Sequence, residues 1–159
     1  KLGKELGIEW KLRGFIKAEL FTDEQAEAMY EAGFREILVG FESGSPLILK
    51  NIGKCATREE NTKCVEIARR HGERIKALMS IGHPGENEDT IRETEEWLSE
   101  IQPDSFDLTR ITVYPGTPYF DHAIPHPTEK GICGRLFLWL ASKRPSASNL
   151  FFSCSKANC

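Results

Sequence analysis

The chain has 159 residues, of which 40% are hydrophobic and 28% charged, a balance typical of a soluble globular protein with one domain-sized core. Its net charge of −3 gives no electrostatic reason to expect a nucleic-acid partner, and no apolar run is long enough to cross a membrane. Five cysteines, an odd number, argue against a closed disulfide framework, so we expect a reduced, cytoplasmic protein. Because the chain begins with Lys1 rather than Met, we expect the polypeptide to extend upstream.

Apolar runs and helix-capping signals predict three strand–helix units followed by a last strand. Thr22 with Gln25, and Thr57 with Glu60, form capping-box patterns that begin helices, and Gly33 stands where a left-handed residue ends the first of them. The nearly continuous apolar run of the second strand is typical of a parallel sheet covered on both faces. The predicted strands span residues 15–20, 36–42, 75–81 and 106–113. The predicted helices span residues 23–32, 58–71 and 88–101, with a short one near 47–52.

Strands that alternate with helices at this spacing predict an α/β fold, namely a partial TIM-like (βα) barrel with parallel strands and right-handed crossovers. In such folds, ligands bind where the carboxyl ends of the strands meet. The unusual residues of this sequence gather at those ends, at Glu19 and in the loops 42–46, 82–86 and 114–118. We therefore expect one site along this edge.

The character of the sequence changes near Ile124. Residues 130–159 contain five basic residues and no acidic ones, and a lone apolar run, LFLWLA, replaces the strand–helix alternation. We therefore divide the chain into a barrel-like part, residues 1–124, and an irregular tail, residues 125–159, which we expect to be disordered. The tail is either a genuine C-terminal extension or a non-native segment translated outside the reading frame.

Three strings of residues carry a resemblance to a known family. They are AGFREILVGFESGSPLILKNIGKCATREE, SIGHPGENEDTIRETEEWL and YPGTPYFD, in this order within residues 10–121. Together they resemble the barrel of the radical S-adenosylmethionine (SAM) superfamily, in particular the branch often associated with cobalamin-binding domains. The resemblance implies SAM as a cofactor, a 4Fe-4S cluster in the parent protein, and cobalamin as a further candidate cofactor there.

The resemblance also implies which residues face SAM. Glu42, at the end of the second strand, and Ser43 beside it match polar positions near the bound SAM, where a carboxylate accepts hydrogen bonds from ribose hydroxyls or an ammonium. Glu19 matches an acidic position that meets the sugar or the amino group in some members. As alternatives, residues 42–45 form only a strand-to-helix turn in which Ser45 caps the helix, and Glu19 has no ligand role.

Three further positions complete the implied site. Lys54 matches a basic position suited to the SAM carboxylate, although the pattern fits a solvated lysine near a helix end equally well. Ile81 and Gly82 match the strand end beside the adenine, where a missing side chain lets a flat ring approach the backbone. His83 receives no chemical role, because the family fills this position variably.

The family's reaction begins at a four-iron cluster held by three cysteines in a CxxxCxxC loop. No three cysteines of this sequence have that spacing, since Cys55 and Cys64 are nine positions apart and Cys154 and Cys159 are five apart. We therefore expect the chain to be a fragment of a radical SAM enzyme that does not catalyse by itself. The sequence indicates no substrate.

Two alternative interpretations remain. The first is a TIM-barrel enzyme that acts on a phosphorylated metabolite, with Gly82–Gly85 as an anion-binding loop, although Glu86 and Glu88 would repel phosphate. The second is a βα module without catalytic activity.

Overall fold

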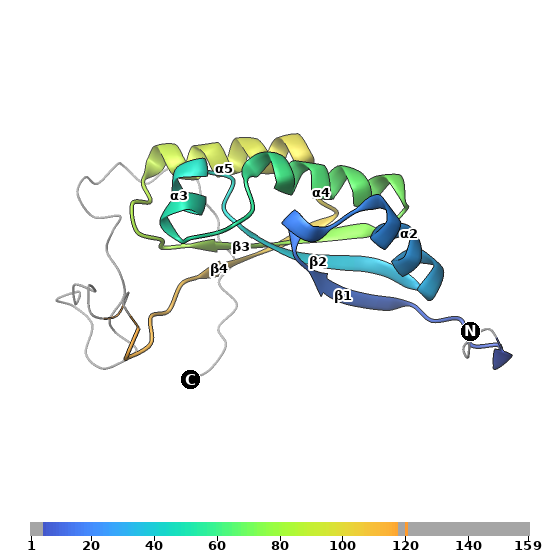
Figure 1. The fold of residues 1–159 in the computed structure, drawn as a ribbon. Coiled ribbons are helices and arrows are strands. Elements are labelled where there is room, and N and C mark those ends of the chain that lie inside the picture. Colours follow the sequence, from blue (N-terminus) through green and yellow to red (C-terminus); the bar gives the residue numbers. More distant parts are fainter. Residues whose placement is uncertain (1–4, 118–119, 121–159) are drawn as a thin grey trace.

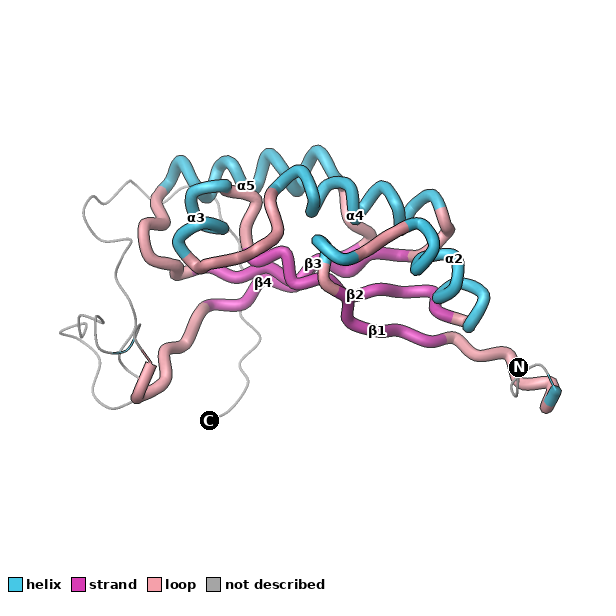
Figure 2. Tube along the Cα trace, viewed as in Figure 1, coloured by secondary structure: helices cyan, strands magenta, loops and turns pink. Residues whose placement is uncertain are grey.

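The structure, a computed structural model, describes residues 5–117 and residue 120. In this part of the chain, four strands form one sheet in the order β1-β2-β3-β4, and each neighbouring pair is parallel (Figures 1 and 2). The strands are β1 (Leu12–Ile16), β2 (Phe34–Glu42), β3 (Arg74–Ile81) and β4 (Ser105–Arg110). The helical elements are the 3-10 turn η1 (Ala18–Leu20) and the helices α2 (Asp23–Ala32), α3 (Pro46–Asn51), α4 (Arg58–Arg70) and α5 (Glu88–Ile101). The predicted α/β fold with parallel strands is confirmed.

The predicted helix ends are confirmed by their caps. Thr22 and Gln25 form a reciprocal capping box at the start of α2, and Thr57 and Glu60 form another at the start of α4. Gly33 follows α2 with a φ of 105°, and a Cβ there would lie 2.8 Å from a backbone oxygen of the segment before β1. Both the left-handed backbone and the close packing therefore require glycine at this position.

The first strand lies earlier in the chain than predicted. We predicted a strand over residues 15–20, but β1 ends at Ile16 and the chain then forms η1. The chain turns there because Ala18 and Phe21 are buried and η1 packs against α4, which a longer extended strand would prevent. The last strand likewise ends before the predicted residue 113.

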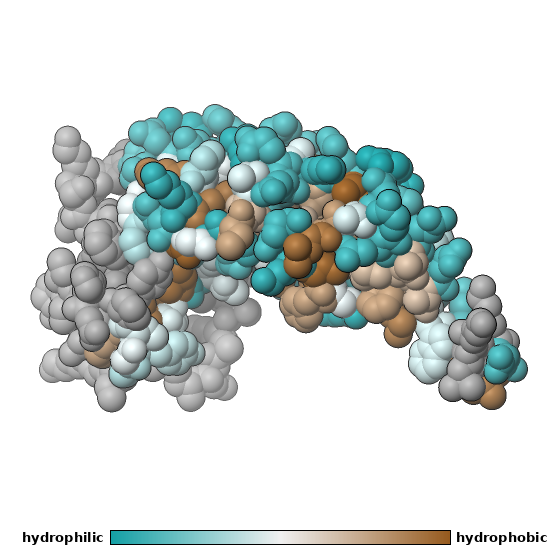
Figure 3. All heavy atoms as spheres, in the orientation of Figure 1, coloured by the Kyte–Doolittle hydropathy of each residue, from teal (hydrophilic) through white to brown (hydrophobic). Residues whose placement is uncertain are grey.

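The helices cover one face of the sheet, as Figure 1 shows, and the core lies between the two layers. Alternate residues of the two central strands point into it. They are Ile37, Val39 and Phe41 from β2 and Ile75, Ala77 and Met79 from β3. Trp97 of α5 is fully buried, and its ring meets Phe41 edge-on at a centroid distance of 5.3 Å. The outer surface of the helix layer is mainly hydrophilic (Figure 3).

The opposite face of the sheet carries no helix among the described residues (Figure 1). Glu36 lies between Arg13 and Arg74, at 3.8 and 3.9 Å, and Lys76 Nζ lies 2.8 Å from Asp107. The prediction that both faces of the sheet are covered stays a prediction for this second face.

Among the helices that the structure describes, none has the length and hydropathy of a membrane span. The predicted boundary at residue 124 and the predicted irregular tail, residues 125–159, lie outside the described residues.

Candidate functional site

The carboxyl ends of β2 and β3 bring several polar side chains together. We call five of them the edge cluster: Glu42, Lys54, Ser80, His83 and Glu86. Glu42 is the last residue of β2, and the pairing of β2 with β3 becomes irregular just before it. Its φ of 67° lies in the left-handed region, which residues other than glycine rarely adopt. Strained backbone of this kind is often found at functional sites.

The Glu42 carboxylate has two partners. The Ser80 hydroxyl donates a hydrogen bond to Oε2 at 2.6 Å, and the Lys54 ammonium lies 3.8 Å from Oε1. Lys54 Nζ also donates to the Gly40 carbonyl oxygen at 2.5 Å. A Cβ at position 40 would stand 2.9 Å from Glu42 Oε1, so a larger residue there would displace this carboxylate. The side chains of Glu42 and Lys54 remain 34% and 26% exposed, so a ligand can reach both.

His83 is buried and bonded to the same serine. The residue is 4% exposed, and its ring nitrogen Nε2 lies 2.8 Å from Ser80 Oγ. Its Nδ1 has no hydrogen-bond partner among the described residues. Burial lowers the pKa of the imidazole, and the charge of Glu42 opposes that shift. The surroundings of His83 therefore favour the neutral form.

The loop after β3 is held by Glu86. Its carboxylate accepts a hydrogen bond from the Gly82 amide at 2.6 Å, and its own amide donates to the His83 carbonyl oxygen at 3.1 Å. Burial raises the pKa of the Glu86 carboxyl, and the Gly82 amide opposes that shift. Gly82 has a φ of 96°, and the nearest atom that a Cβ on it would meet is 3.9 Å away. The neighbouring atoms are thus at ordinary van der Waals distance, and Gly82 has no side chain that would keep a flat ring from its backbone.

Ser43 is engaged with α5 rather than with the edge cluster. It is 2% exposed, its Oγ lies 3.0 Å from Thr94 Oγ1, and it accepts a hydrogen bond from the Ser45 amide at 3.1 Å. The Gly44 amide donates to the same Thr94 oxygen at 3.1 Å. Ser45 precedes the first residue of α3, but its hydroxyl donates to Glu93 and makes no cap with the helix amides. The alternative in which Ser45 caps the helix through its side chain is therefore wrong.

Four of the predicted SAM-facing residues lie near the carboxyl ends of β2 and β3, and Glu19 belongs to another element. Glu42 and Lys54 are paired, and Ile81 and Gly82 stand at the end of the neighbouring strand. Glu19 belongs to η1, three residues beyond the end of β1, and no hydrogen bond or ion pair in the described part of the chain joins it to Glu42. Among the described residues, Glu42 is therefore paired with Lys54 rather than with Glu19.

Sequence reasoning missed Ser80 and assigned no role to His83. The available signal was the alternation of side chains along β3, in which successive residues face opposite sides of the sheet. Ser80 is the one polar residue in the LMSI end of this strand, and it faces away from the side on which Met79 is buried. No local sequence pattern indicated that Ser80 would pair with Glu42.

The described cysteines do not form a metal site. No group of three or more potential metal-ligating side chains occurs among the described residues. Cys55 is an exposed free thiol and Cys64 a buried one. Burial raises the pKa of Cys64 to about 12, with the charges of Glu73 and Glu19 adding to the shift. A thiol with this pKa stays protonated, whereas iron–sulfur clusters are held by thiolates. These two cysteines therefore do not fit the cluster that the resemblance implied.

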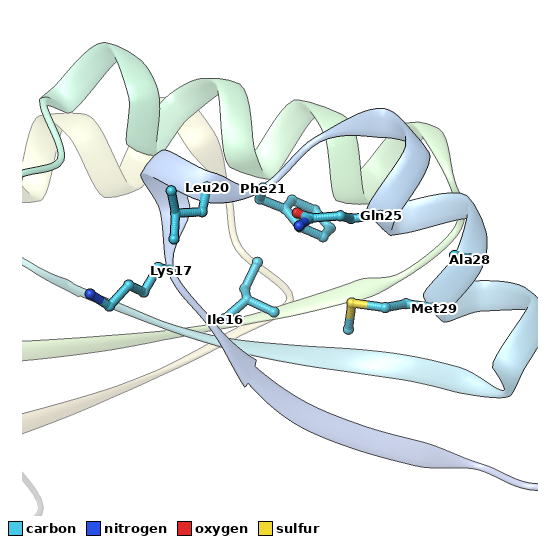
Figure 4. A pocket seen from close by; sticks show the side chains of 7 residues that line it. All are labelled: Ile16, Lys17, Leu20, Phe21, Gln25, Ala28 and Met29. Atoms are coloured by element: carbon cyan, nitrogen blue, oxygen red, sulfur yellow. The ribbon is translucent and has the colours of Figure 1, made fainter.

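Two open apolar grooves lie outside the edge cluster. One, of about 440 Å³, runs between β1, η1 and α2 (Figure 4). It is lined by Ile16, Lys17, Leu20, Phe21, Gln25, Ala28 and Met29. The other, of about 360 Å³, lies along α5 and the start of β4. Neither groove is lined by a residue of the edge cluster.

The family described as Radical SAM superfamily matches residues 4–98, more than half of this chain, so the chain belongs to the radical SAM superfamily. An uncharacterized methyltransferase of Pyrococcus horikoshii is 30% identical over 121 residues, which are 76% of this chain and 26% of that protein. The bacteriochlorophyllide d C-12(1)-methyltransferase of Chlorobaculum tepidum is 27% identical over 118 residues, 74% of this chain and 26% of that protein. The chain thus spans about a quarter of the length of these relatives.

Solved structures share the fold. The radical SAM methyltransferase TsrM from Kitasatospora setae, with cobalamin and a 4Fe-4S cluster bound, matches with a TM-score of 0.64 at 22% identity, covering 70% of this chain and 23% of that one. Coproporphyrinogen III oxidase from Escherichia coli, a radical SAM enzyme, matches with a TM-score of 0.62 at 13% identity, covering 66% of this chain and 24% of that one. The predicted partial radical SAM barrel is therefore confirmed.

Proposed function

We propose that this chain is the part of a radical SAM enzyme that binds SAM at the carboxyl edge of its sheet. Membership of the family implies SAM as a cofactor. The observation that supports the site is the Glu42–Lys54 pair, a negative and a positive group 3.8 Å apart and partly exposed at that edge. The amino-acid end of SAM carries an ammonium and a carboxylate, so the pair is complementary to it in charge.

Each member of the pair has a proposed role. Glu42 accepts hydrogen bonds from the ammonium or the ribose hydroxyls of SAM through Oε1, since Oε2 is engaged with Ser80. Lys54 receives the SAM carboxylate. Its ammonium has three donors, and the hydrogen bond to Gly40 occupies one of them.

The adenine is proposed to lie against Ile81 and Gly82. The lack of a side chain on Gly82 supports this placement, because a ring can approach a backbone that carries no side chain. Glu19 is a further proposed contact, on account of its place just beyond the end of β1. The contacts of Ser43 with α5 support a role in holding the loop after β2 rather than in touching SAM.

The family also implies a 4Fe-4S cluster. Because the described cysteines do not fit it, we assign no catalytic step to this chain, and we propose that it does not catalyse without cluster ligands from elsewhere. Cobalamin is proposed for the whole protein only, since a methyltransferase of similar fold holds it. The odd number of cysteines supports a reduced, cytoplasmic protein, and the net charge of −3 supports the proposal that nucleic acid is not a partner.

The alternative of a phosphate site in the loop after β3 finds less support. The Gly82 amide, which such a site would use as a donor, is bonded to the Glu86 carboxylate. This carboxylate occupies the position of the anion and repels a second one.

Equilibrium binding of SAM to the purified chain, measured by titration calorimetry, tests the proposal. Glu42→Gln keeps the shape of the side chain and removes its charge, and Glu96→Gln, at an exposed position on α5, is the matched control. We expect Glu42→Gln to weaken binding about tenfold to a hundredfold, the scale of a hydrogen bond to a charged group. The control should bind as the wild type does. Wild-type chain that binds no SAM, or Glu42→Gln that binds it equally well, would refute the proposal.

A further inference from the structure

The Ser80 hydroxyl links the Glu42 carboxylate to the buried His83 imidazole. Its oxygen lies 2.6 Å from Glu42 Oε2 and 2.8 Å from His83 Nε2. A hydroxyl has one proton to donate, and an ionised carboxylate only accepts. The Ser80 proton therefore goes to Glu42, and His83 Nε2 carries a proton that it donates to Ser80.

The rest of the imidazole agrees with this tautomer. A neutral ring with its proton on Nε2 leaves Nδ1 without a proton, and Nδ1 has no partner in the described part of the chain. A proton on Nδ1 would be a buried donor without an acceptor, which costs free energy. Burial also lowers the pKa of His83, which disfavours the form with both nitrogens protonated.

We infer that Ser80 and His83 are positioning residues, which hold the Glu42 carboxylate in the orientation that binds SAM. The inference rests on the proposed SAM site. Glu42 needs such support because its backbone is strained, with a φ of 67°, and its side chain is one-third exposed. The hydrogen-bond chain from His83 through Ser80 fixes Oε2, and Oε1 is then presented beside Lys54 for the ligand.

The imidazole is not needed to hold the loop in which it lies. The loop after β3 is fixed by the bond of the Glu86 carboxylate to the Gly82 amide and by the bond of the Glu86 amide to the His83 carbonyl oxygen. Neither contact involves the ring. Among the described residues, the hydrogen bond of the ring goes to Ser80, so its effect is exerted on Glu42.

Nitrogen-15 NMR of the chain labelled at histidine tests the hydrogen-bond chain without any ligand. We expect His83 to be neutral with its proton on Nε2, its signals being identified by their loss in His83→Gln. Ser80→Ala removes the acceptor of this proton, so the proton should redistribute between the two nitrogens. Ser99→Ala removes an exposed hydroxyl on α5 and should change nothing. A proton on Nδ1 in the wild type, or an unchanged tautomer in Ser80→Ala, overturns the inference.

SAM titration then tests the effect on Glu42. We expect Ser80→Ala and His83→Leu each to weaken binding about fivefold to tenfold, the effect of one lost hydrogen bond to the site. His83→Gln keeps an amide donor near the position of Nε2, and Ser80→Thr keeps the hydroxyl, so both should restore most of the affinity. If Ser80 and His83 had only a structural role, variants of equal thermal stability would not differ in SAM affinity in this way.

The outcomes separate this inference from the proposed function. Wild-type chain that binds no SAM overturns both. Binding that is lost in Glu42→Gln but retained in Ser80→Ala and His83→Leu overturns the inference alone. If His83→Leu does not fold, Ser80→Ala decides, because it removes a single oxygen atom from the same hydrogen-bond chain.

Discussion

The two edges of the sheet use charged residues in different ways. At the amino edge, Glu36 lies between Arg13 and Arg74, whose side chains are 66% and 65% exposed. At the carboxyl edge, the charge of Glu42 is tied through a serine to a histidine that is almost fully buried. Exposed pairs contribute little and tolerate change, whereas buried polar groups need every partner. The amino edge is therefore expected to tolerate substitution, and the carboxyl edge is where we propose the site, as in other (βα) barrels.

The left-handed residues divide in the same way. At the amino edge, such residues follow the long helices, and they are Gly33 after α2, Gly72 after α4 and Gln102 after α5. There they serve to end a helix. At the carboxyl edge, Glu42 and Gly82 end strands instead, and both belong to the proposed site. These five left-handed residues thus follow helices at the amino edge and end strands at the carboxyl edge, whereas Gly53 follows the short helix α3.

The largest effect of a substitution is expected under the carboxyl edge, at Trp97. Its side chain is fully buried, and its indole N–H donates to Thr62 at 2.9 Å. The indole atom Cε3 would lie 2.9 Å from a Cβ placed on Gly44 of the loop after β2. Trp97→Ala should lower the free energy of unfolding by about 3–5 kcal/mol, measured by urea unfolding. Trp97→Phe keeps a ring and should cost less. Equal stability of Trp97→Ala and the wild type would show that the carboxyl edge is not built on this ring.

One residue near the amino edge departs from the pattern of exposed pairs. Glu73 is 4% exposed, and both of its carboxylate oxygens lack a partner within the described residues. Burial raises its pKa, and the charges of His71 and Arg35 oppose that shift. A raised pKa means that the folded state binds the proton more tightly than the unfolded state. The protonated Glu73 carboxyl therefore stabilises the folded state fully below the pKa that the group has in the unfolded state. This stabilisation is lost as the pH rises through the pKa of Glu73 in the folded state.

An intermediate effect, of opposite sign, is therefore expected at Glu73. Glu73→Gln removes the buried charge and should raise the free energy of unfolding at neutral pH by about 1–2 kcal/mol. The gain should shrink in mild acid, where the wild-type carboxyl is protonated. Glu66→Gln, at an exposed position on α4, is the control and should show no such pH dependence. A loss of stability at neutral pH would show that the folded state stabilises the Glu73 carboxylate.

The smallest effect is expected at the amino edge, from Arg13. Its guanidinium lies 3.8 Å from Glu36 and is mostly exposed, so Arg13→Ala should change the free energy of unfolding by less than about 0.5 kcal/mol. Salt should reduce even this difference, because it screens exposed charges. Urea unfolding at low and high salt measures both quantities. A large loss that persists in high salt would mean that the amino edge is as constrained as the carboxyl edge.

The order and type of the main helices and strands could be predicted from local residue patterns. The capping pairs at Thr22 and Thr57 and the glycine at position 33 placed the helix ends correctly, and apolar runs located the three later strands. These signals are reliable because a cap or a strand depends on residues within a few positions. The first strand was placed too late, since the buried residues after Ile16 belong to a turn under α4 that resembles strand in composition.

Which side chains meet at the ends of those elements depends on how the elements pack together. Ser80 reaches Glu42 across 38 residues, and Ser43 reaches Thr94 across 51. Both contacts depend on the irregular register of β2 against β3 and on the docking of α5, which leave no periodic signal in the sequence. Local hydrogen bonds can be predicted from spacing, but those between distant side chains follow from how whole elements pack. The partners of Glu42 were therefore beyond prediction, although its place at a strand end was not.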